Sequence, residues 1–366
     1  MMKRICIYGC SEMLGGTEKY ILTLYKALNK EETQFDFLYP YNIGDIPYKK
    51  EIEEQGGKIY KEYYKHSDRK KKGAISPDEL FEKHPEWVGM YINWQSVDTA
   101  YRLIIAAKKH SCKYRIVHAH NNNYNRKFYL KDKIYEKYFR LTKRLYITDQ
   151  LACSNLAGRW LFKNNNFKVI PDAVEFDKFK YSEEKRSQIR EELHIKNSEM
   201  VIGFCGRLVE QKNINFLLDI FQVMQKKRDN IKLLIVGDGV LRKNFEKKIE
   251  EYNLKKKVIL VGAVNNVEDY MQAMDCFILP SLFEGFGIVL LEAQAAGLKC
   301  FASKYVVPRE TNVTGNVTFL DLKDGPECWA ECILGEEIKR YDAMQKLKQS
   351  PYEIQNTVKL IEKIFK

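Results

Sequence analysis

The stretch SLFEGFGIVLLEAQAAG, residues 281–297, is the most informative part of this chain for its fold. It holds two glutamates, Glu284 and Glu292, and glycines stand close after the first of them. Glycine lets the backbone approach a ligand closely. The apolar run Ile288 to Ala296 predicts a helix, and the N–H groups at a helix start attract anions. Two acids beside such a start suit a ligand with both phosphates and hydroxyls, which describes a nucleotide sugar.

Length and composition limit the class of protein to which this chain can belong. The chain has 366 residues, of which 45% are hydrophobic, and this is more than one ordinary core needs. No apolar run is long enough to span a membrane. The start MMKRICIYGC is followed soon by Glu12 and Glu18, so it predicts a first strand and not a signal peptide. Nine scattered cysteines indicate free buried thiols in a reducing cytoplasm, and not a metal site.

The net charge of +12 indicates an anionic partner, which can be a nucleic acid, a membrane surface or an anionic substrate. Much of the excess lies in Lys61–Lys72 and Lys127–Arg144. The chain carries no zinc-finger, RNA-recognition or helix-turn-helix signature, so we expect no nucleic-acid partner.

Strands and helices alternate along the chain, as is typical of parallel sheets. In the first half the predicted strands are Arg4–Tyr8, Phe35–Leu38, Lys58–Tyr60, Met90–Asn93 and Tyr114–Ala119. A more regular series follows, with strands at Met200–Cys205, Leu233–Val236, Val258–Val261 and Asp275–Leu279. The pattern predicts an α/β protein of two Rossmann-like, doubly wound domains that face each other across a cleft. Ligands are expected at the carboxyl ends of the strands.

Three loops that follow predicted strands are candidate phosphate or nucleotide contacts. Gly15 and Gly16 follow the first strand and open a helix, although an ordinary turn has the same appearance. Arg207 and Lys212 stand after the strand Met200–Cys205, where they can neutralise a diphosphate leaving group or form a solvated surface pair. Gly237-Asp238-Gly239 fits a nucleotide pocket or a tight turn equally well.

His118 and His120 end another predicted strand and share one of its sides if the strand continues that far. A metal site needs a third ligand, and none is identifiable in the sequence. We expect one histidine to face a ligand, and the alternative is that both are core or loop residues.

Together these segments resemble the retaining GT-B glycosyltransferases of family 4, the glycosyl transferases group 1. The resemblance covers nearly the whole chain. It rests on the segments GRLVEQKN (206–213), LLIVGDG (233–239), LPSLFEGFG (279–287) and LEAQAAG (291–297). GGTEKY (15–20) and RIVHAHN (115–121) resemble the branch that builds bacterial capsular polysaccharide and exopolysaccharide.

The resemblance implies a donor site in the C-terminal domain. Arg207 and Lys212 hold the donor diphosphate, Glu284 contacts the donor sugar, and Glu292 binds the ribose hydroxyls. The remaining donor contacts implied in this domain are Gly206, Gly237, Ala263, Val264, Phe286, Gly287 and Ile288. No metal or other cofactor is implied, because family members need none.

The resemblance also implies roles for the N-terminal domain, which binds the acceptor. Gly15 and Gly16 cover the donor phosphates, and His120 matches the active-site histidine better than His118. The implied domains are residues 1–170, residues 171–350, and a final helix in 351–366 that crosses back. Two departures stand out: the usual Pro-Asn-Gly is Pro171-Asp172-Ala173, and the loop after Ser303 lacks the usual glycines.

The predicted reaction is transfer of a sugar from a UDP-sugar to a hydroxyl of a glycan or lipid-linked acceptor, with retention, in bacterial surface polysaccharide synthesis. Two other readings remain open. One is a GT-B sugar-nucleotide 2-epimerase, and the other is a non-catalytic binder of membrane or nucleic acid. Lys131–Arg140 mixes cations and aromatics at helical spacing, which suits either an anionic membrane or an ordinary amphipathic helix. We expect a cytoplasmic protein, with the inner face of the membrane as the alternative.

Overall fold

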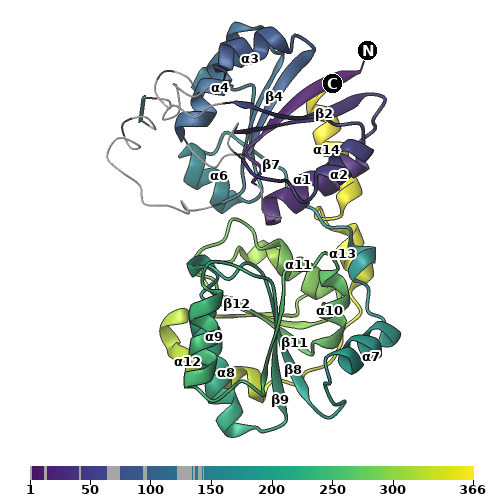
Figure 1. The fold of residues 1–366 in the computed structure, drawn as a ribbon, viewed down its shortest axis with the longest axis vertical. Coiled ribbons are helices and arrows are strands. Elements are labelled where there is room, and N and C mark those ends of the chain that lie inside the picture. The colour runs from purple at the N-terminus through teal and green to yellow at the C-terminus, as the bar shows by residue number, and fades with distance from the viewer. Residues whose placement is uncertain are drawn as a thin grey trace. The chain divides into compact units, whose positions relative to one another are not determined.

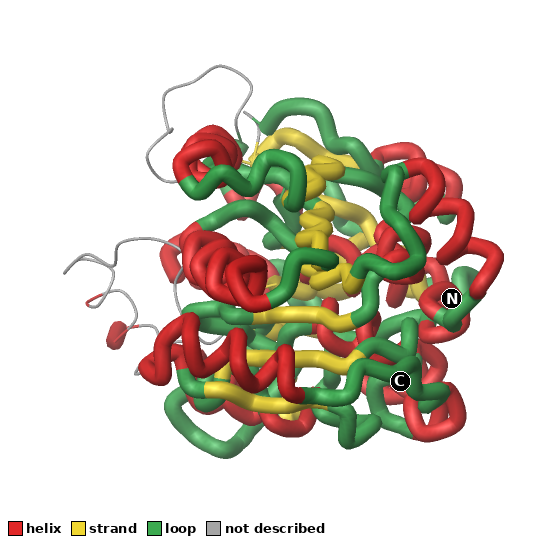
Figure 2. The backbone as a smooth tube through the Cα atoms, turned by 90° about the horizontal axis from the view of Figure 1, so that it is seen from below, coloured by secondary structure: helices red, strands yellow, loops and turns green. Residues whose placement is uncertain are grey.

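The computed structural model describes residues 2–11, 15–40, 43–63, 75–93, 97–121, 134, 137–138, 142 and 144–366. The chain divides into two compact units, each with its own sheet (Figure 1). Unit 1 holds Met1–Ala173 and Ile354–Lys366, and unit 2 holds Val174–Glu353. In each unit helices flank the sheet (Figure 1), and Figure 2 draws the helices red and the strands yellow.

Unit 1 contains a seven-stranded parallel sheet in the order β3-β2-β1-β4-β5-β6-β7. Buried apolar side chains run through its central strands, as expected when helices cover both faces of a parallel sheet. The strands are β1 Lys3–Tyr8, β2 Thr33–Pro40, β3 Ile59–Tyr63, β4 Trp87–Asn93, β5 Tyr114–Ala119, β6 Asp149–Ala152 and β7 Lys168–Val169. The helices are α1 Gly16–Ala27, α2 Lys49–Glu54, α3 Pro77–Lys83, α4 Val97–Lys109 and α6 Asn155–Phe162.

The helix α14, Ile354–Ile364, completes unit 1 although it follows unit 2 in the sequence. It packs beside α1, and Figure 1 shows the two as neighbouring yellow and purple helices. Just beyond it, Phe365 is 1% exposed, and its carbonyl oxygen accepts a hydrogen bond of 2.6 Å from the Tyr114 hydroxyl. Phe365 is therefore part of the core of unit 1.

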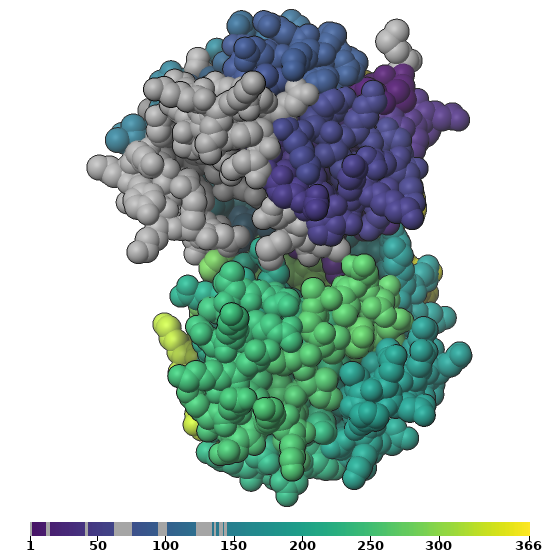
Figure 3. Space-filling view, in the orientation of Figure 1, coloured from purple at the N-terminus to yellow at the C-terminus, as the bar shows by residue number. Residues whose placement is uncertain are grey.

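Unit 2 contains a six-stranded parallel sheet in the order β10-β9-β8-β11-β12-β13. The strands are β8 Met200–Cys205, β9 Ile231–Val236, β10 Val258–Gly262, β11 Cys276–Leu279, β12 Lys299–Ser303 and β13 Val317–Leu320. The helices are α7 Glu183–Glu192, α8 Ile214–Lys227, α9 Arg242–Glu251, α10 Val267–Ala273, α11 Ile288–Ala295, α12 Gly325–Gly335 and α13 Met344–Gln349. In Figure 3 the visible surface of this unit is mostly teal to light green, the colours of the chain from α7 to α11.

The predicted fold class is confirmed, because both sheets are parallel and doubly wound. Each of the nine predicted strands is present, and six of them are one to four residues longer than expected. The strands β6, β7, β12 and β13 were not predicted. The cleft between the domains and their acceptor and donor roles stay predictions. Most of Lys131–Arg140, and residues 64–72 of the charged segment Lys61–Lys72, lie outside the described residues.

In the part of the chain that the structure describes, no helix is long and apolar enough to cross a membrane.

All nine cysteines are free thiols, and seven of them are buried, as the sequence predicts. Burial raises the pKa of the thiols of Cys6, Cys10 and Cys276 well above the ordinary value. A thiol that stays protonated is a poor nucleophile. Cys328 is exposed and Cys332 is partly exposed.

We therefore expect a disulfide-exchange reagent to modify Cys328 rapidly and Cys332 more slowly in the folded protein. The other seven thiols react after denaturation, when the reagent reaches them and their pKa values return to normal. A time course with a chromogenic thiol reagent, with and without denaturant, measures this. Rapid native reaction of more than two thiols would contradict the buried arrangement.

Candidate active site

The donor-site candidates of unit 2 gather at the carboxyl ends of its strands. Gly206 and Arg207 directly follow β8, and Lys212 ends a short 3₁₀ turn, Glu210–Lys212. A Cβ atom on Gly206 would lie 3.6 Å from Cε of Lys212, so the lysine side chain passes close to this glycine. Arg207 is half-buried, and its guanidinium has no hydrogen-bond or ion-pair partner among the described residues. An unpaired, half-buried cation suits an anionic ligand.

Lys212 and Glu284 form the centre of this site, although they are 72 residues apart in the sequence. Nζ of Lys212 lies 2.5 Å from Oε1 of Glu284, and both side chains are largely buried. Ser281, which is fully buried, donates a hydrogen bond of 2.7 Å to the same oxygen. One carboxylate oxygen of Glu284 therefore has two donors, which fixes the orientation of the carboxylate.

The loops after β8, β9 and β10 pack tightly against one another. The N–H of Gly237 donates to the carbonyl oxygen of Gly262 at 2.7 Å, directly before Ala263 and Val264. A Cβ atom on Gly237 would lie 2.1 Å from the carbonyl oxygen of Gly206, so only glycine fits there. The structure thus brings together the three loops in which the sequence places nucleotide contacts.

The helix α11 begins beside this cluster. Gly287 is its N-cap residue, with a left-handed φ of 89°, and Ile288 is the first helical residue. Phe286 is 2% exposed and packs on the ring of Tyr352. Glu292 lies one turn after Ile288 on the same face of the helix and is 6% exposed. The free N–H groups at the start of α11 make this end of the helix suitable for a phosphate.

Tyr305 occupies the loop where the sequence departs from the usual glycines. Its φ of 67° is left-handed, and its side chain is 75% exposed. Val307, two residues further, lies 3.8 Å from a Cβ atom built on Gly287, so this loop borders the start of α11. A tyrosine in this backbone conformation costs about 1–2 kcal/mol.

We expect Tyr305→Gly to raise the free energy of unfolding by roughly 0.5–1 kcal/mol, because glycine adopts this φ without strain but loses more entropy on folding. Tyr305→Ala is the matched control, since it removes the ring and keeps the strain. Urea titration measures both variants. If the glycine variant is no more stable than the alanine variant, the strain is absent.

In unit 1, Gly15 is the N-cap residue of α1 and Gly16 is its first residue, so the two glycines open a helix as predicted. The buried carboxylate of Glu18 accepts hydrogen bonds from the N–H groups of Ser11, at 2.7 Å, and Gly15, at 3.0 Å. The Gly15 amide therefore already has a partner, whereas Gly16 is exposed at the start of the helix.

His120 stands directly after β5, and its ring is bonded at both nitrogens. Nδ1 lies 2.8 Å from Oδ1 of Asp172, and Nε2 lies 2.8 Å from Oδ1 of Asn93. The ring of His118 is 4.0 Å away, centroid to centroid. Its Nε2 contacts the carbonyl oxygen of Ile170 at 3.1 Å, and its Nδ1 contacts the Tyr91 hydroxyl at 2.5 Å. His118 is thus the core residue, and His120 belongs to a polar cluster at the carboxyl ends of the strands.

Asp172 is the functional candidate that the sequence analysis left without a role. Its side chain is the third possible metal ligand that the sequence does not reveal, within 4.8 Å of both histidines. Every ring nitrogen of the pair already has a hydrogen-bond partner, however, so the described geometry fits a hydrogen-bonded network better than a metal centre.

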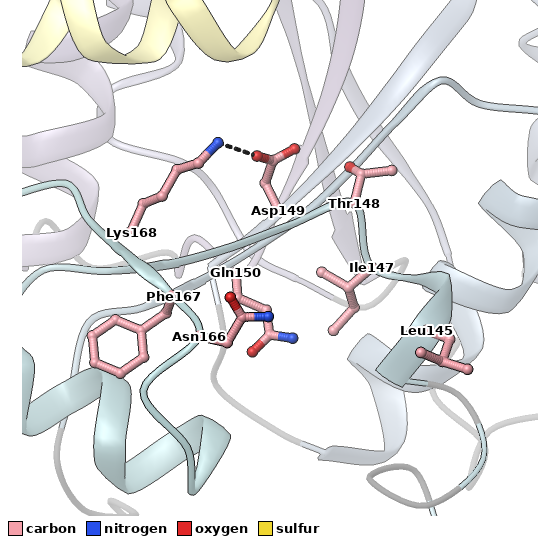
Figure 4. Close-up of a pocket in the computed structure, with 8 residues that line it drawn as sticks. All are labelled: Leu145, Ile147, Thr148, Asp149, Gln150, Asn166, Phe167 and Lys168. Atoms are coloured by element: carbon pink, nitrogen blue, oxygen red, sulfur yellow. Dashed lines mark hydrogen bonds and ion pairs between the residues drawn. The ribbon is translucent and has the colours of Figure 1, made fainter.

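A pocket of about 320 Å³ lies in unit 1 at the amino ends of its strands (Figure 4). The polar cluster of His120 lies at their carboxyl ends. It is bordered by Asp149 and Lys168, the first residues of β6 and β7, which form an ion pair of 2.8 Å. The polar cluster around His120 follows the last residues of β5 and β7. The pocket is therefore separate from the candidate site.

The family of glycosyl transferases group 1 matches residues 185–323, which contain the unit 2 site. The putative glycosyltransferase EpsF of Bacillus subtilis is 28% identical over 94% of this chain and 91% of its own length. The UDP-Gal:alpha-D-GlcNAc-diphosphoundecaprenol alpha-1,3-galactosyltransferase of Escherichia coli is 33% identical, over 40% of this chain and 37% of its own.

Among solved structures, Anabaena HepE in complex with UDP and glucose superposes with a TM-score of 0.79. The match covers 100% of this chain and 99% of HepE at 16% identity, so it supports the fold alone. The fold, the matched segment and the full-length relative agree. Residues 185–323 therefore belong to the glycosyl transferases group 1 family, and the chain is a glycosyltransferase with the GT-B fold.

Proposed function

We propose that this chain transfers a sugar, with retention, from a UDP-sugar to a hydroxyl of a glycan or lipid-linked acceptor in bacterial surface polysaccharide synthesis. The observation that carries this proposal is the cluster of Arg207, Lys212 and Glu284 in the matched unit, close to the start of α11. It offers cations for a diphosphate and a carboxylate for sugar hydroxyls.

The names of relatives support the choice of substrates. HepE was solved with UDP, and the Escherichia coli relative is named as using UDP-galactose and a diphosphoundecaprenol acceptor. EpsF, the relative aligned over most of the chain, is itself named a putative glycosyltransferase. A UDP-sugar donor and a lipid-linked acceptor are therefore the first substrates to test.

In the proposed reaction, the acceptor oxygen attacks the anomeric carbon on the face from which UDP departs. The bond between that carbon and the β-phosphate oxygen breaks, and its electron pair stays on UDP. The acceptor proton passes to a diphosphate oxygen. Arg207, Lys212 and the start of α11 stabilise the charge on UDP, and Glu284 orients the sugar. Such preorganised charges act on the transition state without having to rearrange.

The test is incubation with UDP-sugars in the presence and absence of short glycan or lipid-linked acceptors, followed by product analysis. Transfer only with an acceptor, with the anomeric configuration of the donor kept, supports the proposal. Conversion of the UDP-sugar without any acceptor supports a 2-epimerase instead. Thermal-shift assays with UDP, GDP and ADP identify the base, and EDTA treatment tests the prediction that no metal is needed.

Glu284 and Glu292 are expected to have different roles. Glu292→Gln mainly weakens donor binding, raising the donor Kd by roughly 10-fold or more, because a charged hydrogen bond to the ribose is lost. Glu284→Gln mainly lowers kcat, since the carboxylate bonded to Lys212 orients the transferred sugar. Calorimetric binding and saturation kinetics separate the two effects. If both variants change the donor Kd alone, this division of roles is wrong.

A further inference from the structure

The hydrogen-bond partners of His120 determine where its protons are. The carboxylate of Asp172 accepts at Nδ1. At Nε2 the partner is the carbonyl oxygen of the Asn93 amide, because the amide nitrogen of that side chain faces the Tyr8 carbonyl oxygen at 3.4 Å. Both partners of the ring are acceptors, so both ring nitrogens must donate. An imidazole that donates twice carries a positive charge.

The pair of His120 and Asp172 is buried. The side chains of His120 and Asp172 are each only 5% exposed. A buried charge is tolerated when a partner of opposite charge bonds to it directly. Asp172 is therefore the counter-ion of the His120 ring, bonded to it at 2.8 Å.

The neighbouring histidine fits a charged His120. Burial, followed by the charge of His120, lowers the pKa of His118 well below its ordinary value. His118 is therefore neutral, and its two nitrogens contact the Tyr91 hydroxyl and the Ile170 carbonyl oxygen. The ring of Tyr20, from α1, packs against both histidine rings, with centroids at 5.7 and 5.4 Å. The two histidine rings are thus held in fixed positions.

We propose that Asp172 is a positioning residue that holds His120 as a fixed imidazolium cation at the carboxyl end of the first sheet. With both nitrogens bonded, the ring cannot take a proton from the acceptor, so its contribution to transfer is electrostatic. This inference rests on the proposed function. It also gives a role to the aspartate that replaces the usual asparagine of the Pro-Asn-Gly motif.

Asp172→Asn is the most informative substitution, because it keeps the shape and one acceptor oxygen but removes the counter-charge. We expect kcat to fall roughly 10- to 100-fold, as for the loss of a charge-assisted hydrogen bond. The Kd for UDP is expected to stay unchanged, since neither Asp172 nor His120 is among its proposed contacts. Asp149→Asn is the matched control, because it also removes a carboxylate from an ion pair of 2.8 Å on the same sheet. It should leave kcat unchanged.

Nitrogen-15 NMR of the histidine rings gives a readout that a purely structural role would not change. In the wild-type protein at neutral pH, both His120 ring nitrogens should carry protons, and Asp172→Asn should remove one of them. A singly protonated His120 in the wild type overturns the inference, and so does an Asp172→Asn variant with unchanged kcat. The NMR result does not need turnover. A doubly protonated His120 without sugar transfer would therefore refute the proposed function and leave the ion pair standing.

Discussion

Lys212→Ala is expected to lower kcat by about 10²–10³-fold in a protein that still folds. Nζ of Lys212 lies 2.5 Å from Oε1 of Glu284 at the carboxyl end of β8, and the side chain is only 14% exposed. In the proposed reaction this cation stabilises the departing diphosphate and holds the glutamate that faces the sugar. Its loss removes both contributions, whereas Ser281 still bonds to Glu284 and limits the structural damage.

Saturation kinetics with the donor identified by thermal shift measure this effect, and circular dichroism checks the fold. Lys248→Ala is the matched control, since Nζ of Lys248 makes a similar contact of 2.6 Å with Asp219 in the same unit, away from the cluster. Turnover unchanged in Lys212→Ala would remove this lysine from the proposed role. An equal loss in the control would indicate a general effect of ion pairs on the unit.

Asp275→Ala is expected to reduce the free energy of unfolding by about 3–5 kcal/mol, because two largely buried arginines lose the carboxylate that pairs with them. The Asp275 carboxylate contacts Arg186 at 2.6 Å and Arg190 at 2.7 Å. It also accepts a hydrogen bond of 2.7 Å from the N–H of Val201, in β8. The Arg190 side chain is 2% exposed, and burial lowers the pKa of its guanidinium, whereas the charge and hydrogen bond of Asp275 raise it.

Urea titration measures the loss, and hydrogen exchange over α7 and β8 locates it in unit 2. Asp219→Ala provides the comparison, because its partners Lys248 and Tyr252 lie nearer the surface. Removing such an ion pair typically costs about 1 kcal/mol or less. Equal destabilisation by the two substitutions would show that burial of Arg190 has no special effect.

The sequence predicted the architecture because the strongest pattern belongs to the buried central strands. β8, with the sequence MVIGFC, is buried along its whole length and has the predicted bounds. β7 was missed because it has only two residues, Lys168 and Val169, and both are exposed. The other missed strands, β6, β12 and β13, are four or five residues long. Short strands of this kind form mainly because their side chains pack against neighbouring strands.

The candidate site could be predicted in part. The loops with Arg207, Lys212, Glu284 and Gly287 each follow a strand or start a helix, and these are local features. The contact between His120 and Asp172 joins residues 52 positions apart. It depends on how β5 and the segment after β7 are placed by the sheet. The sequence signal that could have revealed it is the aspartate in place of the usual asparagine.

The return of α14 to unit 1 has a consequence for protein synthesis. On a ribosome, all of unit 2 emerges before the residues that complete unit 1, because residues 354–366 follow it in the chain. Unit 2 can therefore acquire its native structure first, while the nascent unit 1 still exposes the apolar surface that later covers Ile354, Val358 and Ile361. Such exposed surface attracts chaperones and favours aggregation. Premature translational termination before residue 354 would accordingly damage the N-terminal half of the protein more than the C-terminal half.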